Sequence, residues 1–454
     1  MNTIRHSTAL MTDMYELTMI ESALHSGYAR RRSVFELFAR SLPGRRRYGV
    51  VAGTARALRA VEDFRFGREE IDYLRAAHTV GEETLRWLEN FRFSGDIWGY
   101  PEGECYFPNS PLLTVSGTFA ECVVLETILL SILNYDSAVA TAASRITIAA
   151  HERPCLDMGA RRIHEEAAVA AARACVIGGF AGTSNLEACR RYGIRAIGTA
   201  AHSFTLLHES EPEAFAAQIK TMGTGTTLLV DTYDVRKGVE NAVRAAKEAG
   251  GSLGAVRLDS GDLVAQAFQV REQLDSLGAT ETKITVTSDL DEYSIAALNA
   301  APVDSYGVGT RVVTGSGQPT AQMVYKLVSR EDSAGIMREV AKKSVSKATH
   351  GGLKVAGRTY GENGKAAEEL IVAAPNREAG LAYLKARNAR PLQVELVAGG
   401  KINPEYTAPE SLSRAARLHR DSRAALPYPA WRLSEGDPAI PTVLKDICEE
   451  SGGE

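Results

Sequence analysis

The sequence predicts an α/β fold: a parallel sheet in the middle of the chain, and a second, α+β domain formed by its two ends. Three observations lead to this prediction. Between about residues 154 and 320, short apolar runs alternate with helical segments. These runs end in Gly, Asp, Thr or Ser and recur roughly every 20–35 residues, a spacing typical of βαβ units. Both ends of the chain lack this alternation and contain strand-like runs of their own.

Each element is predicted from its own run of residues. Helical segments come first, followed by strand-like pieces within 91–107. In the middle, strands are expected within 173–180, 194–199, 226–233, 254–259, 283–288 and 305–310, and helices within 161–174, 185–193, 236–250, 262–278 and 291–301. Several of these helices close with Gly, a common helix C-cap. Strands return at 324–330, 336–342 and 368–374, and a helix follows at 411–426.

These elements suggest three segments. Residues 1–125 form the N-terminal part of the α+β domain, residues 126–325 form the α/β domain, and residues 326–454 form the C-terminal part, with hairpins and then a helical tail. The two outer segments are expected to pack together, with the middle segment inserted between them. A chain of 454 residues is long enough for two such domains.

Composition excludes several classes of protein. Hydrophobic residues make up 44% and charged residues 24%, an ordinary globular balance. The net charge of -4 gives no support to a nucleic-acid partner. The six cysteines form no CxxC pair, so they are expected to be reduced thiols in the cytoplasm. The N-terminus lacks an apolar signal segment, and the run 123–133 is interrupted by Glu126 and too short to span a membrane. We expect that run to be a buried helix.

Polar side chains gather after the predicted strands. In chain order they are Arg161, Arg162, Thr183, Ser184, His202, Asp231, Asp234, Arg257, Asp259, Asp262, Asp289, Gly309 and Thr310. Each has an ordinary interpretation, since an Asp before a helix is usually an N-cap. Because the carboxyl ends of parallel strands share one face, however, these residues should lie together. Carboxylates, arginines and the Gly-rich turns at 307–310 and 315–317 suit a phosphorylated substrate and Mg²⁺.

The histidine in GTAAHSF (198–204) leaves two interpretations open. It is either a packed structural residue or a catalytic group, and the local pattern alone favours packing. Other enzyme classes are disfavoured. The chain has neither a Walker A motif nor a dinucleotide-binding GxGxxG in the right context. An aldolase or isomerase acting through a Schiff base would need a lysine at a strand end, and none is present there.

The ordered set of motifs resembles one family. TDMYELTM (12–19), FELFARSLP, FAGTSNLEA, GTAAHSF, LLVDTYD, VRLDSGDL and GVGTRVVTG (307–315) follow one another as in the nicotinate phosphoribosyltransferases. KATHGGLKVAGRTY (347–360) is similar to the family's Lys-rich hairpin. The resemblance implies an irregular TIM-like α/β barrel with a second α+β domain, in a homodimer with shared active sites. It also implies condensation of nicotinate with 5-phosphoribosyl-1-pyrophosphate, coupled to ATP hydrolysis with Mg²⁺, in NAD salvage.

The resemblance also implies roles for individual residues. His202 is expected to be phosphorylated by ATP, which reverses the packing interpretation. Asp231 and Asp289 are alternatives for orienting its ring and for binding Mg²⁺. Asp259 is expected to hold the ribose hydroxyls or to stabilise the oxocarbenium-like transition state. The expected substrate-binding residues are Tyr15, reaching in from the neighbouring subunit, with Arg161, Ser184, Thr199, Arg257, Gly309 and Thr310.

Differences between this chain and related enzymes indicate which pyridine it uses as substrate. Nicotinamide-specific enzymes have an Asp where this chain has Ser184, and an Asp would repel the carboxylate of nicotinate. A quinolinate enzyme is disfavoured by the chain length and by His202. A relative that only binds nucleotides or a partner protein is disfavoured, because His202, Asp231, Arg257 and Asp259 are all retained. Arg311 is expected on the surface rather than at a phosphate.

Overall fold

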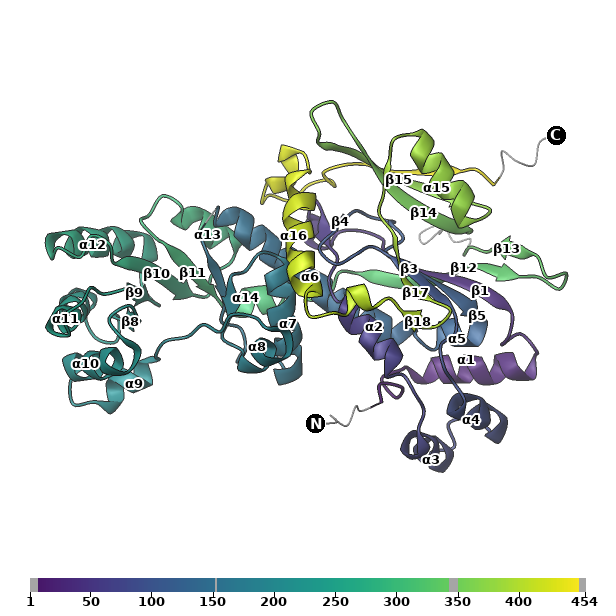
Figure 1. Cartoon of the computed structure of the whole chain (residues 1–454), viewed down its shortest axis with the longest axis horizontal. Helices are drawn as coiled ribbons and strands as arrows, with labels where there is room; N and C mark the ends of the chain where they lie inside the picture. Colours follow the sequence, from purple (N-terminus) through teal and green to yellow (C-terminus); the bar gives the residue numbers. More distant parts are fainter. Residues whose placement is uncertain (1–6, 152, 343–349, 449–454) are drawn as a thin grey trace. The chain divides into compact units, whose positions relative to one another are not determined.

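The computed structural model describes residues 7–151, 153–342 and 350–448, and the chain divides into two compact units. Unit 1 comprises residues 1–138 and 320–454, and unit 2 comprises residues 139–319 (Figure 1). The first boundary falls inside helix α6 (Glu126–Ala149), which begins in unit 1 and ends in unit 2. The two ends of the chain therefore form one domain and the middle another, as the sequence predicts.

Unit 2 is built around a six-stranded parallel sheet in the order β7-β6-β11-β10-β9-β8. Its strands are β6 (Cys155–Asp157), β7 (Gly182–Thr183), β8 (Thr227–Leu229), β9 (Ala255–Leu258), β10 (Lys283–Ser288) and β11 (Ser305–Val308). Strands that follow one another in the chain are neighbours in the sheet, and the last strand, β11, pairs with the first, β6. The exception is that β7 and β8 do not pair. The sheet is thus a barrel that remains open at one seam, which confirms the irregular barrel class.

Helices connect successive strands of unit 2, as parallel pairing requires, and a short last helix, α14, follows β11. They are α7 (Glu165–Ile177), α8 (Leu186–Tyr192), α9 (His202–Leu207), α10 (Glu211–Met222), α11 (Val235–Glu248), α12 (Leu263–Ser276), α13 (Glu292–Leu298) and α14 (Thr310–Val313). Figure 1 shows α10 to α13 along the outer side of the strands. The side chains of Asp234 and Asp262 accept hydrogen bonds from Lys237 N (2.8 Å) and Ala265 N (3.1 Å). Both acids are therefore N-caps, the ordinary interpretation of an Asp before a helix.

Two predicted strands of unit 2 are wrong. Residues 173–177 of the run 173–180 belong to α7, and the run 194–199 contributes only an isolated bridge between Thr183 and Ala196. The seam between β7 and β8 contains α8, α9 and α10 in place of a paired strand. The irregularity of the barrel is located there.

Unit 1 joins distant parts of the chain in one antiparallel sheet of seven strands, in the order β13-β12-β1-β5-β3-β17-β18. Strands β1 (Arg32–Ala39), β3 (Asp96–Gly99) and β5 (Leu113–Thr118) come from the N-terminal part; β12 (Met323–Glu331), β13 (Met337–Glu339), β17 (Val394–Ala398) and β18 (Lys401–Ile402) come from the C-terminal part. Phe35 of β1 lies opposite Leu327 of β12 in this ladder. The pairing confirms that the two ends share a domain.

The rest of unit 1 covers and extends this sheet. Its helices are α1 (Met14–His25), α2 (Thr54–Glu62), α3 (Arg68–Ala76), α4 (Glu82–Glu89), α5 (Phe119–Val123), α15 (Arg377–Ala386) and α16 (Ser411–Ala424). A four-stranded sheet has the order β16 (Arg390–Pro391), β14 (Leu353–Tyr360), β15 (Ala366–Ala374) and β19 (Thr442–Asp446), and β2 (Gly49–Val50) pairs with β4 (Cys105–Tyr106). Short 3-10 turns lie at Pro43–Arg45, Pro404–Tyr406 and Tyr428–Trp431. The first part of the Lys-rich hairpin, 347–349, lies outside the described residues.

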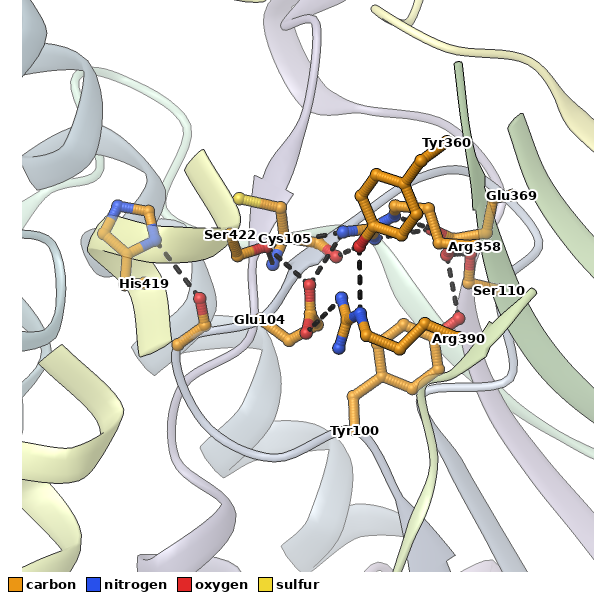
Figure 2. Close-up of polar contacts among 11 residues, drawn as sticks. Tyr100, Glu104, Cys105, Ser110, Arg358, Tyr360, Glu369, Arg390, His419 and Ser422 are labelled. Carbon is orange, nitrogen blue, oxygen red and sulfur yellow. Dashed lines mark hydrogen bonds and ion pairs between the residues drawn. The ribbon is translucent and has the colours of Figure 1, made fainter. Parts of the chain in front are cut away.

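A buried ionic network crosses between the two parts of unit 1 (Figure 2). The guanidinium of Arg358 is fully buried and bonds Glu104 (2.7 Å) and Glu369 (2.6 Å), both also buried. Arg390 pairs with the other oxygen of Glu104 at 3.0 Å, and Tyr100 donates its hydroxyl to Glu369 at 2.8 Å. Although burial opposes its charge, the two carboxylates raise the pKa of Arg358 above its ordinary value. The network therefore links β4 and its neighbours to β14 and β15 through buried ion pairs.

One stretch, Phe119–Ala149, is long and apolar enough to cross a membrane by length and composition. It contains α5 and α6, so the helix continues well past the run 123–133 recognised in the sequence. Sixty-seven per cent of its most apolar window is buried inside the protein. A core helix of a soluble protein passes the same test, and the burial agrees with the expected buried helix.

Candidate active site

His202 begins α9, on the open side of the barrel after β7. Its Nδ1 lies 3.0 Å from Oγ1 of Thr232, and its Nε2 lies 3.8 Å from Oδ1 of Asp231. The side chain of His202 is 40% exposed, whereas that of Asp231 is 2% exposed. The imidazole is therefore held by two neighbours yet remains accessible to a ligand, which is unlike a packed core histidine.

Asp231 and Asp259 link the ends of three neighbouring strands. Oδ2 of Asp231, after β8, accepts hydrogen bonds from the backbone N–H of Asp259 (2.8 Å) and from the hydroxyl of Ser260 (2.9 Å), both after β9. Asp259 in turn accepts a hydrogen bond from Thr287 of β10. The remaining oxygen of Asp231, Oδ1, is buried and accepts no hydrogen bond. This oxygen lies nearest to His202 and is available to a proton or a cation.

Arg257 lies in β9 beside this group. It donates to Oγ1 of Thr199 and to the carbonyl of Ala200, both at 3.0 Å, so it also holds the segment before His202. Its Nε is buried without a hydrogen-bond partner. Burial lowers the pKa of Arg257, the nearby charge of Arg161 lowers it further, and Asp259 and Asp231 oppose the change. The unpartnered Nε and the incomplete charge balance suit an anionic ligand at this position.

The turn after β11 contains Gly309 and Thr310, with Gly309 as the N-cap of α14. Close packing requires the preceding glycine, Gly307: a Cβ there would lie 2.5 Å from Cγ2 of Thr287. Arg311 follows this turn, and its Nε lies 3.6 Å from Oδ2 of Asp289, in a pair whose side chains are 47% and 63% exposed. Arg311 is thus half-exposed and paired with Asp289. Of the two acids considered for orienting His202, only Asp231 lies beside it.

Arg161 and Ser184 lie on two neighbouring loops that follow β6 and β7. Asp157, at the end of β6, joins these loops. Its carboxylate accepts hydrogen bonds from Gly159 N (2.9 Å) and from the hydroxyl of Thr183 (2.6 Å), and its carbonyl accepts one from Ser184 N (2.9 Å). Asp157 is 1% exposed, and this burial raises the pKa of its carboxyl group. The hydroxyl of Ser184 makes no hydrogen bond within the described residues, which leaves it free to bind a ligand.

Asp157 is absent from the site residues that the sequence predicts. The available signal was its position as an acid directly ending a strand, as with Asp259. Unlike Asp234 and Asp262, it caps no helix, because α7 begins eight residues later and is capped by His164. A strand-end acid that caps no helix is as strong a candidate for the functional site as the other strand-end carboxylates.

Tyr15 belongs to unit 1, in the first turn of α1, and is 44% exposed. Partial burial, together with the charges of Glu126 and Glu16, raises its pKa to about 12. The phenol therefore stays neutral at physiological pH. Met11 and Met14, also exposed, lie beside it in sequence.

Comparisons with known proteins agree with this geometry. Residues 10–134 match the nicotinate phosphoribosyltransferase N-terminal domain, and residues 154–359 match the nicotinate phosphoribosyltransferase family. Nicotinate phosphoribosyltransferase pncB1 of Mycobacterium tuberculosis (strain ATCC 25618 / H37Rv) is 52% identical over 441 residues, covering 95% of this chain and 94% of the relative. Nicotinate phosphoribosyltransferase of Bacillus subtilis (strain 168) is 38% identical over 332 residues, covering 72% and 68%.

A solved structure shares the architecture. The crystal structure of human nicotinic acid phosphoribosyltransferase is similar with a TM-score of 0.80 and 24% identity, covering 97% of this chain and 98% of the human one. This likeness shows a common two-domain fold built on a parallel α/β barrel. Together with the sequence matches, it confirms the resemblance drawn from the motifs. The chain belongs to the nicotinate phosphoribosyltransferase family.

Proposed function

We propose that this chain joins nicotinate to 5-phosphoribosyl-1-pyrophosphate, forming nicotinate mononucleotide and pyrophosphate in the salvage of nicotinate for NAD. Family membership and the names of the relatives support both substrates. The observation with most weight is the group at the ends of β8 and β9. A partly exposed histidine, two carboxylates and a guanidinium with an unpartnered Nε meet there.

The proposal includes phosphorylation of His202 by ATP. The bond between the γ-phosphorus and its bridging oxygen breaks, an N–P bond to the imidazole forms, and ADP leaves. The ring gains positive charge in this step, and the buried carboxylate of Asp231, 3.8 Å from Nε2, is suited to stabilise it. Water later hydrolyses the N–P bond and releases phosphate, so that one ATP is consumed in each coupled turnover.

The arginines are proposed to bind the carboxylate of nicotinate. Arg257 and Arg161 are close enough for the charge of one to lower the pKa of the other, and a carboxylate between them would relieve that repulsion. The free hydroxyl of Ser184 can donate a hydrogen bond to the same carboxylate. Thr199, which accepts a hydrogen bond from Arg257 at 3.0 Å, keeps that guanidinium in position.

The ribose and its phosphate are proposed to bind at the neighbouring strand ends. Asp259, held by Thr287, is suited to accept hydrogen bonds from the ribose hydroxyls and to stabilise positive charge at the anomeric carbon. Gly309 and Thr310 are proposed to bind the 5-phosphate, because α14 begins there and the first N–H groups of a helix have no partner within the helix.

Mg²⁺ would neutralise the phosphate groups of the substrates when bound. The open Oδ1 of Asp231 fits such a role, since it is buried and accepts no hydrogen bond. Within the described residues, no three His, Cys, Asp or Glu side chains group closely enough to hold a metal ion by themselves. The remaining ligands would therefore be water and phosphate oxygens, as Mg²⁺ prefers. Asp289, paired with Arg311, is the weaker candidate.

We also propose a cytoplasmic homodimer with shared active sites. The exposed Tyr15, next to the exposed Met11 and Met14, supports a role for the start of α1 in covering nicotinate in the partner subunit. The cysteines form no disulfide within the described residues, which supports a reducing compartment.

The test of this function uses the purified protein with Mg²⁺, nicotinate and 5-phosphoribosyl-1-pyrophosphate, with and without ATP. Chromatography should detect nicotinate mononucleotide, formed faster with ATP. The His202→Ala variant should lose the ATP effect and the acid-labile ³²P label that [γ-³²P]ATP places on the protein. The partly buried His208, whose Nδ1 lies 2.8 Å from the carbonyl oxygen of Phe204 at the end of the same helix, provides a matched control as His208→Ala.

Three outcomes would count against the proposal. Label retained in His202→Ala would exclude His202 as the phosphorylated residue. Equal use of nicotinamide would contradict the role of Ser184. Product from neither pyridine would favour a protein that binds nucleotides without turning them over.

A further inference from the structure

A cavity of about 440 Å³ lies in unit 1, between α1 and strands β1 and β12 of the seven-stranded sheet. Its walls include the apolar side chains of Met19, Ala23, Phe119 and Leu327. This volume and this apolar lining are typical of small-molecule sites. None of the residues proposed for catalysis or substrate binding lines it.

Two guanidiniums converge at one side of this cavity. Nη1 of Arg31 and Nη1 of Arg330 both donate to the carbonyl oxygen of Glu331, at 3.4 Å and 3.2 Å. Within the described part of the chain, neither arginine forms an ion pair with a carboxylate. Arg32, by contrast, pairs with the carboxylate of Glu331 at 3.0 Å. Two like charges are thus held at one carbonyl, with most of their N–H groups free.

The serine and threonine hydroxyls of the cavity are already engaged. The hydroxyls of Thr18, Ser22 and Ser26 donate to main-chain carbonyls of α1, at 3.0, 3.0 and 2.8 Å. The ring of Tyr28 lies 3.8 Å from the guanidinium carbon of Arg31 and restrains its position. The two guanidiniums, together with the hydroxyl of Tyr28, are therefore the donors left for a ligand within the described residues.

We propose that this cavity binds a monocarboxylic acid with a compact apolar body, aromatic or medium-chain aliphatic. The carboxylate would pair with Arg31 and Arg330, and the body would lie against Met19, Ala23, Phe119 and Leu327. A polyphosphate or a sugar fits poorly, because only one end of the cavity offers donors. The site is separate from the barrel, so it adds a second ligand to the proposed function.

Calorimetric titration tests this site, with octanoate and benzoate as probes. The measurements use the Arg257→Ala background, which weakens carboxylate binding at the candidate active site. We expect binding of at least one acid and no binding of octanol or benzyl alcohol, which lack the charge. Arg330→Met and Arg31→Met should each weaken it by roughly 10- to 100-fold. Arg30→Met is the matched control, since Arg30 belongs to the same basic run and does not line this cavity.

A second variant tests the role of the cavity independently of the guanidinium charges. Ala23→Phe, on the cavity wall, should abolish binding of both acids while the urea midpoint shows that unit 1 stays folded. The proposal fails if neither acid binds, if the alcohols bind as well, or if the arginine variants bind normally. It also fails if sedimentation shows that a second copy of the chain displaces the acids. Turnover of nicotinate by the unsubstituted protein tests the proposed function independently.

Discussion

Asp157 illustrates how a single buried side chain can position two loops of a site. It contacts no substrate in the proposed function, yet it connects the turn before Arg161 with Thr183 and Ser184. An isolated buried carboxylate is unfavourable unless donors satisfy it. Here the donors are one backbone N–H and one hydroxyl, so the position of the carboxylate and the shape of both loops depend on each other.

We predict that Asp157→Asn and Thr183→Val raise the KM for nicotinate more than they lower kcat. The amide can accept only one of the two hydrogen bonds, and valine removes the donor, so each change should cost about 1–3 kcal/mol of binding. Thr183→Ser keeps the hydroxyl and should restore the KM. The double variant should be no worse than either single one, because both break the same contact.

Steady-state kinetics with nicotinate and nicotinamide checks this prediction. The preference for nicotinate should shrink in both variants, since Ser184 would no longer be held in place. A loss of kcat with an unchanged KM, or full additivity in the double variant, would show that Asp157 acts on stability alone.

The strand-end residues show how far sequence reasoning reaches at this scale. The chain order of apolar runs and polar ends was enough to predict that Asp231, Asp259 and Arg257 share a face. It could not choose between Asp231 and Asp289 for His202, because that choice depends on which strands are neighbours around the barrel. Asp289 follows β10 and pairs with Arg311 after β11, whereas Asp231 follows β8 beside the seam where His202 lies.

At the scale of elements, α1 contains a buried acid with a strongly shifted pKa. Glu16 accepts hydrogen bonds from Thr12 and from the N–H and hydroxyl of Thr127. Burial nevertheless raises the pKa of Glu16 from 4.5 to about 7. The folded protein therefore holds a proton between these pH values that the unfolded chain has released, so stability should decrease as the pH rises from about 4.5 to about 7 and then level off.

We predict that Glu16→Gln flattens this part of the pH profile. The wild type should lose on the order of 2–3 kcal/mol of unfolding free energy between pH 4.5 and 8 through this group, and the variant should not. Urea unfolding at both pH values measures the difference. Glu69→Gln, on the exposed first turn of α3, is the control and should follow the wild type. A variant profile with the wild-type slope would assign the pH dependence to other groups.

Helices with clear capping residues at both ends were predictable from the sequence. Apolar runs were not, because their structure depends on which other elements they pack against. The helices 236–250 and 262–278 have capping acids and closing glycines, and both are present as α11 and α12. The run 173–180 is apolar enough for a strand, but its first five residues extend the alanine-rich α7. The run 194–199 is apolar too, yet it faces the open seam and finds only one bridge partner.

At the scale of the whole molecule, unit 1 depends on residues that are more than 250 positions apart. Its sheet pairs β1 with β12, and its buried network connects Glu104 with Arg358. Composition and length suggested two domains, and the strand-like runs at both ends suggested a shared one. The charged network could not be predicted, because nothing in the sequence around Glu104, just before β4, or Arg358, within β14, indicates that either side chain is fully buried.

This network makes a prediction for the stability of unit 1. Arg358→Met removes a buried cation and leaves Glu369 without its ionic partner, while Glu104 keeps Arg390 (Figure 2). Breaking a buried pair in this way typically costs about 3–5 kcal/mol. The three tryptophans, Trp87, Trp98 and Trp431, all belong to unit 1. Their fluorescence in urea therefore follows the unfolding of this unit alone.

The control is Arg414→Met, which removes a surface pair with Glu405 whose side chains are 42% and 52% exposed. It should cost no more than about 1 kcal/mol, because water screens such pairs. A cost for Arg358→Met as small as for Arg414→Met would mean that the network relaxes around the missing charge. A large loss of unfolding free energy, measured by tryptophan fluorescence, would instead identify the buried charges as the main link between the two parts of the chain in unit 1. In that case the insertion of the barrel into the chain is tolerated because this network, together with the β1–β12 ladder, holds the two parts of unit 1 together.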